Sequence, residues 1–241
     1  MTRGAFPTTQ GSMVEAMTSP DDDARRAAFA AMVAVYWRPV YFHLRMRWAR
    51  EPADAEDLTQ EFFAAALAGD FFAGYDPARA RFRSFLRLCC DRFATRRVRD
   101  AHRLKRGGGA VHLPLDFASA ELELAAGSSG EADPEARFDA ETVRSLLALA
   151  VDALRDECRA GGHDVRFAVF ERYDLTPDGG NRPTYREIAD ALGLPVTQVT
   201  NHLAWARKAV RRHALERLRW LCASEAEYRE EARALFGVVQ Q

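Results

Sequence analysis

Residues 196–212 place short polar side chains ahead of a group of cations, an order that suits binding to nucleic acid. The polar side chains could reach base edges in a major groove, and the cations behind them could contact phosphates. The polar set is Thr197, Gln198, Thr200, Asn201 and His202, and the cationic set is Arg207, Lys208, Arg211 and Arg212. The segment therefore predicts recognition of duplex DNA, with an ordinary amphipathic helical hairpin as the alternative.

A second concentration of binding chemistry lies in residues 81–106, which hold ten cations and two acids, a formal charge of +8. Phenylalanines are interleaved with these cations. That pattern is typical of surfaces for single-stranded nucleic acid, because bases stack on rings while cations follow the backbone. The alternative is that Phe82 and Phe85 belong to the core. Residues 107–164 carry −8, so the net charge of −1 for the whole chain conceals a strong segregation.

Side chains for bond-making chemistry or metal binding do not occur at suitable spacings. Asp54, Glu56 and Asp57 cluster, but no histidine lies at a recognisable spacing from a nucleophile and no HExxH motif occurs. Adjacent Cys89 and Cys90 cannot hold one metal ion in the CxxC manner. We therefore expect no catalytic residue, no metal site and no cofactor, and we interpret the cysteines as packing thiols.

Two helices joined by a tight turn must position residues 196–212. Thr184 and Glu187 have the spacing of a capping box, and Gly193 supplies the left-handed residue at which the first helix ends. Pro195 suits the entry of the second helix. The buried stripe of that helix is predicted at Val196, Val199, Leu203, Ala206 and Val210.

The first half of the chain is also predicted to be helical. We expect residues 1–18 to be a disordered lead-in and residues 19–106 to form a helical domain with a break near Pro39. A helix over 54–67 begins with Asp54 as its cap, and a long helix runs from Arg81.

The second half is predicted to begin with a flexible acidic linker over 107–132. A helical domain over 133–222 then contains the helix-turn-helix. Ser224 and Glu227 predict a further capping box, which begins a helix in a C-terminal extension over 223–241. No stretch has the alternation of a strand, so we predict an all-α protein of two helical domains.

Apolar runs are short throughout the sequence. None approaches the roughly 18 to 20 residues that a membrane span needs, and the first residues lack the apolar core of a signal peptide. We therefore expect a cytoplasmic protein without a membrane partner.

Three motifs, in this order, resemble those of the extracytoplasmic-function (group 4) sigma factors of bacterial RNA polymerase. DAEDLTQEFF is similar to the signature of the first conserved domain of that family. RARFRSFLRLCCDRFATRRVRD is similar to the promoter-melting and −10-reading segment, and TYREIADALGLPVTQVTNHLAWARKAVRR to the −35-reading segment. The resemblance covers residues 20–106 and 134–221.

The resemblance implies a sigma region 2 bundle and a sigma region 4 helix-turn-helix, with roles for specific residues. Contacts to core polymerase, at the coiled coil of the β′ clamp, would come from Asp54, Asp57, Gln60, Glu61 and Phe63. Contacts to the −10 element would come from Tyr75, Arg81, Phe82, Arg83, Phe85, Arg87, Arg92, Arg96 and Arg97. Base edges of the −35 element would meet Thr197, Gln198, Thr200, Asn201 and His202, and phosphates or the β flap would meet Arg207, Lys208, Arg211 and Arg212.

The same resemblance implies a non-enzymatic protein whose partners are core polymerase and promoter DNA, and leaves an anti-sigma partner as an open question. Family recognition helices commonly carry cations where this chain has Thr200, His202 and Trp205. Fewer phosphate contacts predict weak duplex binding by the second domain alone. The alternative is a stand-alone helix-turn-helix transcription regulator, which would bind duplex DNA tightly without polymerase.

Overall fold

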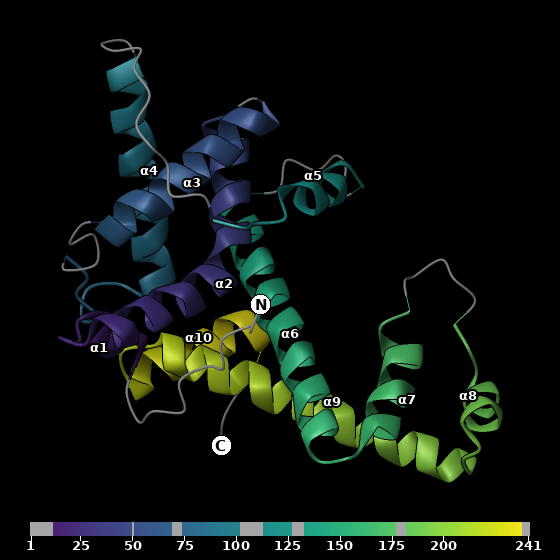
Figure 1. Cartoon of the computed structure of the whole chain (residues 1–241). Helices are drawn as coiled ribbons and strands as arrows, with labels where there is room; N and C mark the ends of the chain where they lie inside the picture. The colour runs from purple at the N-terminus through teal and green to yellow at the C-terminus, as the bar shows by residue number, and fades with distance from the viewer. Residues whose placement is uncertain are drawn as a thin grey trace. The chain divides into compact units, whose positions relative to one another are not determined.

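The computed structural model describes residues 12–49, 51–68, 74–101, 113–126, 133–176 and 182–237, and every regular element in these ranges is an α-helix (Figure 1). The predicted all-α class is confirmed. The chain divides into unit 1, residues 1–145 with 218–241, and unit 2, residues 146–217. This division differs from the expected domain limits, because the first residues of the 133–222 segment and the C-terminal extension both belong to unit 1.

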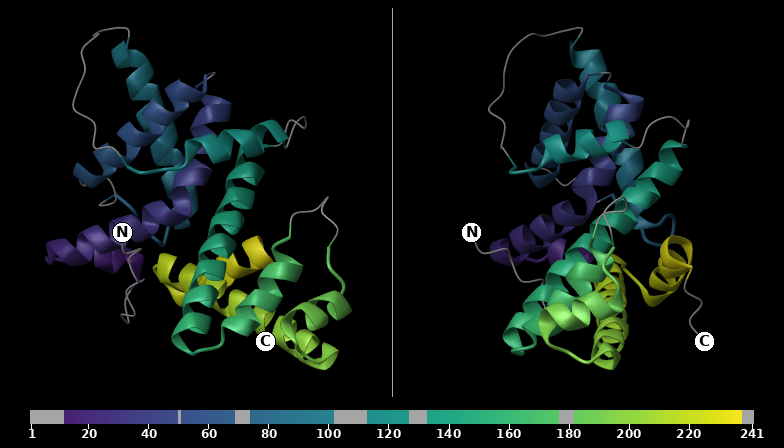
Figure 2. Two further views of the ribbon diagram at one scale, coloured as in Figure 1. Left: turned by 45° about the vertical axis from the view of Figure 1, so that its right-hand side comes forward. Right: turned by 90° about the vertical axis from the view of Figure 1, so that its right-hand side faces the viewer.

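Unit 1 is organised around one long central helix, α2 (Asp22–Arg47), against which α1, α3 and α4 pack. Residues buried on α2 include Met32, Tyr36, Val40, Phe42 and Leu44. The other helices of this unit are α1 (Met13–Met17), α3 (Pro52–Ala68), α4 (Phe82–Ala101), α5 (Phe117–Ala126), the start of α6 (Pro134–Ala160), the end of α9 (Val196–Leu221) and α10 (Glu225–Phe236). Figure 2 shows α3 and α4 beside α2 from two further directions.

Three local expectations for unit 1 need correction. Part of the predicted disordered lead-in is helical, since Ser12 and Glu15 form a capping box at the start of α1. Helix α2 continues through Pro39 without a break. An internal proline costs a helix about 3 kcal/mol, and the burial of Pro39 among the apolar residues of α2 offsets that cost. Helix α3 begins at Pro52 rather than after Asp54, because proline is well suited to the first turn.

Part of the predicted flexible linker is an ordered segment packed on α2. Phe117 and Ala120 of α5 join a buried cluster with Tyr41 and Phe42. The Tyr41 hydroxyl donates to Glu121 at 2.5 Å, and the Arg45 guanidinium donates to the same carboxylate at 3.0 Å. Glu121, one of the acids that suggested a solvated linker, is therefore a partner of α2.

Unit 2 consists of the remainder of α6, helices α7 (Asp164–Asp174) and α8 (Tyr185–Leu192), and most of α9. The predicted helix-turn-helix is present as α8 and α9. Its apolar cluster joins α7 to both of these helices and consists of Val169, Ile188, Ala189, Val199 and Leu203. Gly193 ends α8 at a φ of 64°, in the left-handed region where glycine avoids the strain of a Cβ.

The capping box of α8 gives a first testable prediction. The Thr184 hydroxyl accepts from the Glu187 N–H at 3.2 Å, and the Glu187 carboxylate accepts from the Thr184 N–H at 2.7 Å. We expect Thr184→Ala to lower the free energy of unfolding of unit 2 by about 1 kcal/mol. Urea denaturation would measure this loss, with Thr197→Ala as the control at an exposed threonine. Equal effects of the two substitutions would contradict a stabilising role for the cap.

Candidate nucleic-acid and protein interfaces

The second half of α4 presents an exposed stripe of cations. Arg92, Arg96 and Arg99 lie at i, i+4 and i+7, so they share one face of the helix, and all are exposed. None of the three has a carboxylate partner among the described residues. Arg97 is also exposed but pairs with Glu61 of α3. We call Arg92, Arg96 and Arg99 the cationic stripe; its guanidinium groups are available to bind phosphate.

The first half of α4 carries arginines that are already paired with acids of unit 1. Arg83 is only 7% exposed, and its guanidinium pairs with Glu231 at 2.8 Å and with Asp139. Arg87 pairs with Glu135 at 2.5 Å. Helix α4 therefore carries arginines that pair with acids and, in the cationic stripe, arginines that have no carboxylate partner among the described residues.

Tyr75, Phe82 and Phe85, which were predicted to capture a base, form one aromatic cluster. The ring centroids of Tyr75 lie 5.3 Å from those of Phe82 and Phe85, and Tyr36 of α2 lies 5.6 Å from Phe82. Tyr75 and Phe82 are buried, whereas Phe85 is half-buried. Of the two interpretations of Phe82, the core position is the one present in this structure.

Helix α3 exposes only part of its predicted protein-binding face. Asp54 and Asp57 are exposed. Gln60 is buried, because its amide donates to the Leu113 carbonyl at 2.7 Å and accepts from the Leu113 N–H at 2.8 Å. We expected Phe63 to be exposed, but it is fully buried.

Two aromatic rings account for the burial of Phe63. Its centroid lies 5.2 Å from that of Phe62 and 6.4 Å from that of Phe29. Of the residues that were predicted to contact core polymerase, Asp54 and Asp57 are thus the ones that are exposed to a partner.

A partly buried group of polar side chains joins α4 to the end of α2. Asp91 accepts from the Trp48 indole N–H at 2.8 Å, and Nε2 of His43 lies 2.8 Å from the same carboxylate oxygen. Burial alone raises the pKa of Asp91, but these hydrogen bonds outweigh it and lower the pKa. Burial lowers the pKa of His43, which favours its neutral form. This group holds α4 in place just before the cationic stripe begins.

Most of the polar side chains that were predicted to form one face of α9 are exposed to solvent. Thr197, Gln198, Thr200 and Asn201 are exposed, and His202 is half-buried. The Thr200 hydroxyl donates to the Val196 carbonyl at 3.1 Å, so part of its hydrogen-bonding capacity is used within the helix. These side chains occupy the first turns of α9, where a recognition helix contacts base edges.

Of the cations that follow on α9, two are exposed without a described carboxylate partner and two pair with acids of neighbouring helices. Lys208 and Arg211 are exposed. Arg207 makes two hydrogen bonds of 2.9 Å to Asp174 of α7, and Arg212 donates to Glu157 at 2.7 Å. On the same helix, the Trp205 ring is covered by the Arg166 guanidinium, 4.9 Å from its centroid.

Comparison with protein-family models, curated proteins and solved structures found no match. Function is therefore inferred from the chain's own residues. In the described ranges, no group of three or more His, Cys, Asp or Glu side chains could hold a metal ion, and no helix has the length and apolar character needed to cross a bilayer. Burial raises the pKa of Cys89 to about 11, which keeps this thiol protonated near neutral pH.

Helix α10 carries acidic residues that were not assigned to any binding site from the sequence. The Glu227 carboxylate accepts from the Tyr75 hydroxyl and from the Phe82 N–H, each at 2.9 Å. Glu230 accepts from Arg81 at 3.2 Å. Glu227, Glu230 and Glu231 recur at i, i+3 and i+4, a spacing that indicates one acidic helix face and could have drawn attention to it.

Proposed function

We propose that this chain is a sigma factor, which directs core RNA polymerase to promoters and assists separation of the DNA strands. The observation that carries the proposal is the exposed cationic stripe of α4. The same helix contributes Phe82 and Phe85 to the aromatic cluster. Guanidinium groups hold a nucleic-acid backbone, while rings stack on unpaired bases. The chain makes or breaks no bond in this role; it binds and positions DNA.

The helix-turn-helix supports the second half of the proposal. Its polar side chains are exposed on the first turns of α9, as direct reading of base edges in a major groove requires. Exposed Lys208 and Arg211 follow at distances along the helix that suit flanking phosphates. A −35 promoter element is the duplex that a sigma factor reads in this way.

Ion pairs on α9 favour a sigma factor over a stand-alone regulator. Arg207 and Arg212 are engaged by Asp174 and Glu157, so each phosphate contact they make must compete with an internal carboxylate. Tight binding to duplex DNA depends on the number of phosphates neutralised. A weak duplex reader needs a larger complex to hold it on DNA, and core polymerase supplies that complex.

The exposed acids of α3 support docking to a basic protein surface. Asp54 and Asp57 are open to solvent, while Glu61 pairs with Arg97. Complementary charge increases the rate of encounter and selects the partner. The basic coiled coil of the β′ clamp is the partner we propose for this face.

Substitutions in the cationic stripe test the proposal. We expect Arg92→Ala with Arg96→Ala to reduce promoter opening about tenfold, since two phosphate contacts are lost, while binding to core polymerase is unchanged. Neither arginine has a described carboxylate partner, so no internal ion pair is broken. Permanganate footprinting of unpaired thymines would measure opening, on a promoter identified by sequencing the transcripts made with this chain and core polymerase.

The matched control is Arg159→Ala with Arg229→Ala, two exposed arginines on α6 and α10. Equal opening by the stripe variant and this control would remove the main support for the proposed function. A stripe variant that fails to bind core polymerase would also contradict the assignment, because the stripe is proposed to act on DNA.

A further inference from the structure

A carboxylate of helix α10 accepts hydrogen bonds from the segment that was predicted to contact the −10 element. Glu227 Oε1 accepts from the Tyr75 hydroxyl and from the Phe82 N–H, the latter in the first turn of α4. Backbone N–H groups at a helix start have no intrahelical partner and are natural anion sites. A carboxylate of α10 thus satisfies a donor pair that a phosphate oxygen or a base carbonyl could also satisfy.

The neighbouring carboxylates of α10 neutralise arginines that were predicted to hold the DNA backbone. Glu230 pairs with Arg81 at 3.2 Å, and Glu231 pairs with Arg83 at 2.8 Å. Glu231 also lies 3.4 Å from the Arg81 guanidinium. One acidic helix face therefore engages the Tyr75 hydroxyl, the Phe82 N–H and two arginines of this surface.

We propose that α10 is an internal competitor of single-stranded DNA, and that its acidic face must leave residues 75–83 before the DNA can bind there. This inference rests on the proposed sigma-factor function and adds its regulation. Three carboxylates of α10 take the positions of backbone phosphates. Only the released form binds DNA. The apparent affinity for DNA is therefore the affinity of the released form multiplied by the fraction of chains that are released.

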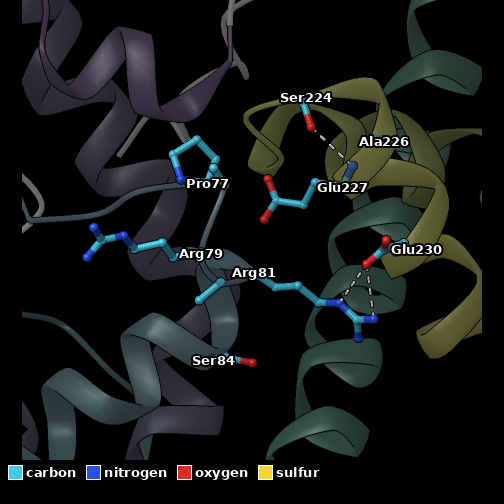
Figure 3. A pocket seen from close by; sticks show the side chains of 10 residues that line it. Pro77, Arg79, Arg81, Ser84, Ser224, Ala226, Glu227 and Glu230 are labelled. Carbon is cyan, nitrogen blue, oxygen red and sulfur yellow. Dashed lines mark hydrogen bonds and ion pairs between the residues drawn. The ribbon is translucent and has the colours of Figure 1, made fainter.

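The contact between α10 and this surface has features of a reversible one. A pocket of about 500 Å³ lies between residues 77–84 and the start of α10. Figure 3 shows Glu227 pointing from α10 toward this space and Arg81 reaching Glu230. Incomplete packing forgoes part of the dispersion energy that holds two elements together.

Burial of charge also limits the strength of docking. Burial raises the pKa of Glu231 above its ordinary value, even though Arg83 and Arg81 lower it. A buried ion pair is opposed by the desolvation of both of its charges. Tyr228 and Ala232 are buried and supply an apolar anchor, so the docked form remains the favoured one without DNA.

Neutral substitutions on α10 test the inference in the full-length chain. We expect Glu230→Gln with Glu231→Gln to tighten binding of a short, mixed-sequence, fluorescein-labelled single-stranded oligonucleotide about tenfold, as measured by fluorescence anisotropy. Glu230→Gln alone alters an exposed residue that the fold does not need, and we expect a gain of about threefold from it. This single variant keeps the test decisive if the double variant does not fold.

The control is Glu225→Gln, which removes a carboxylate from the same helix. Glu225 pairs with Arg219 and Arg229 and has no described contact with residues 75–85. If the Glu230 variants bind the oligonucleotide no more tightly than Glu225→Gln, the inference is overturned. If, in that case, Arg92→Ala with Arg96→Ala still weakens binding of the oligonucleotide, the proposed function survives and only the competition by α10 is excluded. Absence of oligonucleotide binding by every form at low salt would overturn both proposals.

Discussion

Replacing Asp57 with lysine is expected to abolish co-purification of the chain with core RNA polymerase, through a loss of affinity of about a hundredfold or more. Asp57 is exposed on α3, beyond its first turn, so its charge is accessible to a partner and lies outside the region where the helix dipole is strongest. Juxtaposed like charges at an interface cost several kcal/mol, and about 1.4 kcal/mol corresponds to a tenfold change. Pull-down with purified core polymerase would measure the loss.

Asp156→Lys is the matched control for this charge reversal. Asp156 is 76% exposed on α6 and, among the residues that the structure describes, makes a single long ion pair of 3.8 Å, with Arg159. Circular dichroism should show that both variants keep the helical content of the parent chain. Retention of polymerase by Asp57→Lys, at the level of Asp156→Lys, would rule out the α3 face as the docking site.

Replacing Arg83 with leucine is expected to lower the free energy of unfolding of unit 1 by about 3 to 5 kcal/mol, because removal of one partner leaves buried charge without its counterion. Arg83 and Glu231 are both nearly inaccessible, with side-chain exposures of 7% and 5%. Urea denaturation followed by circular dichroism would measure the change. We therefore expect Arg83 to stabilise the contact between α4 and α10, a role that its position in the predicted DNA-binding set did not suggest.

Two further variants separate this effect from a general loss of an arginine. Arg79→Leu alters a residue that is 86% exposed and paired with Asp76, so we expect a change below about 1 kcal/mol. Arg83→Leu combined with Glu231→Leu replaces this ion pair by apolar groups, which is often close to neutral. The double variant leaves Asp139, which is partly exposed, as the one described carboxylate that loses Arg83. If the double variant were no more stable than Arg83→Leu, the loss could not be assigned to an unpaired Glu231.

Features predicted correctly from the sequence are those set by short spacings. The capping box of Thr184 and Glu187 and the left-handed Gly193 involve hydrogen bonds and backbone angles within a few residues. The Ser224 cap was predicted in the same way, and its hydroxyl accepts from the Glu227 N–H at 3.1 Å. The Glu227 carboxylate, however, turns to the Ala223 N–H at 2.7 Å instead of the Ser224 N–H, because it also serves Tyr75 and Phe82.

Features that were missed depend on partners distant in the sequence. Gln60 was assigned to a protein interface, but Leu113, 53 residues away, takes both of its amide hydrogen bonds. A motif reports residue types and spacing, and it contains no information about which other segment will cover it. The same reason explains why part of an acidic linker was expected to be solvated and instead packs as α5 on Tyr41 and Phe42.

The sequence by itself determined that this protein is helical, that a helix-turn-helix lies near its C-terminal end, and that cations gather on one long helix. These properties follow from hydrophobic periodicity, caps and charge, each of which is local. Only the tertiary structure decided which cations are exposed and which aromatic rings are covered. Tyr75 meets its acceptor Glu227 across 152 residues, and only folding brings groups so far apart in the chain within hydrogen-bonding distance.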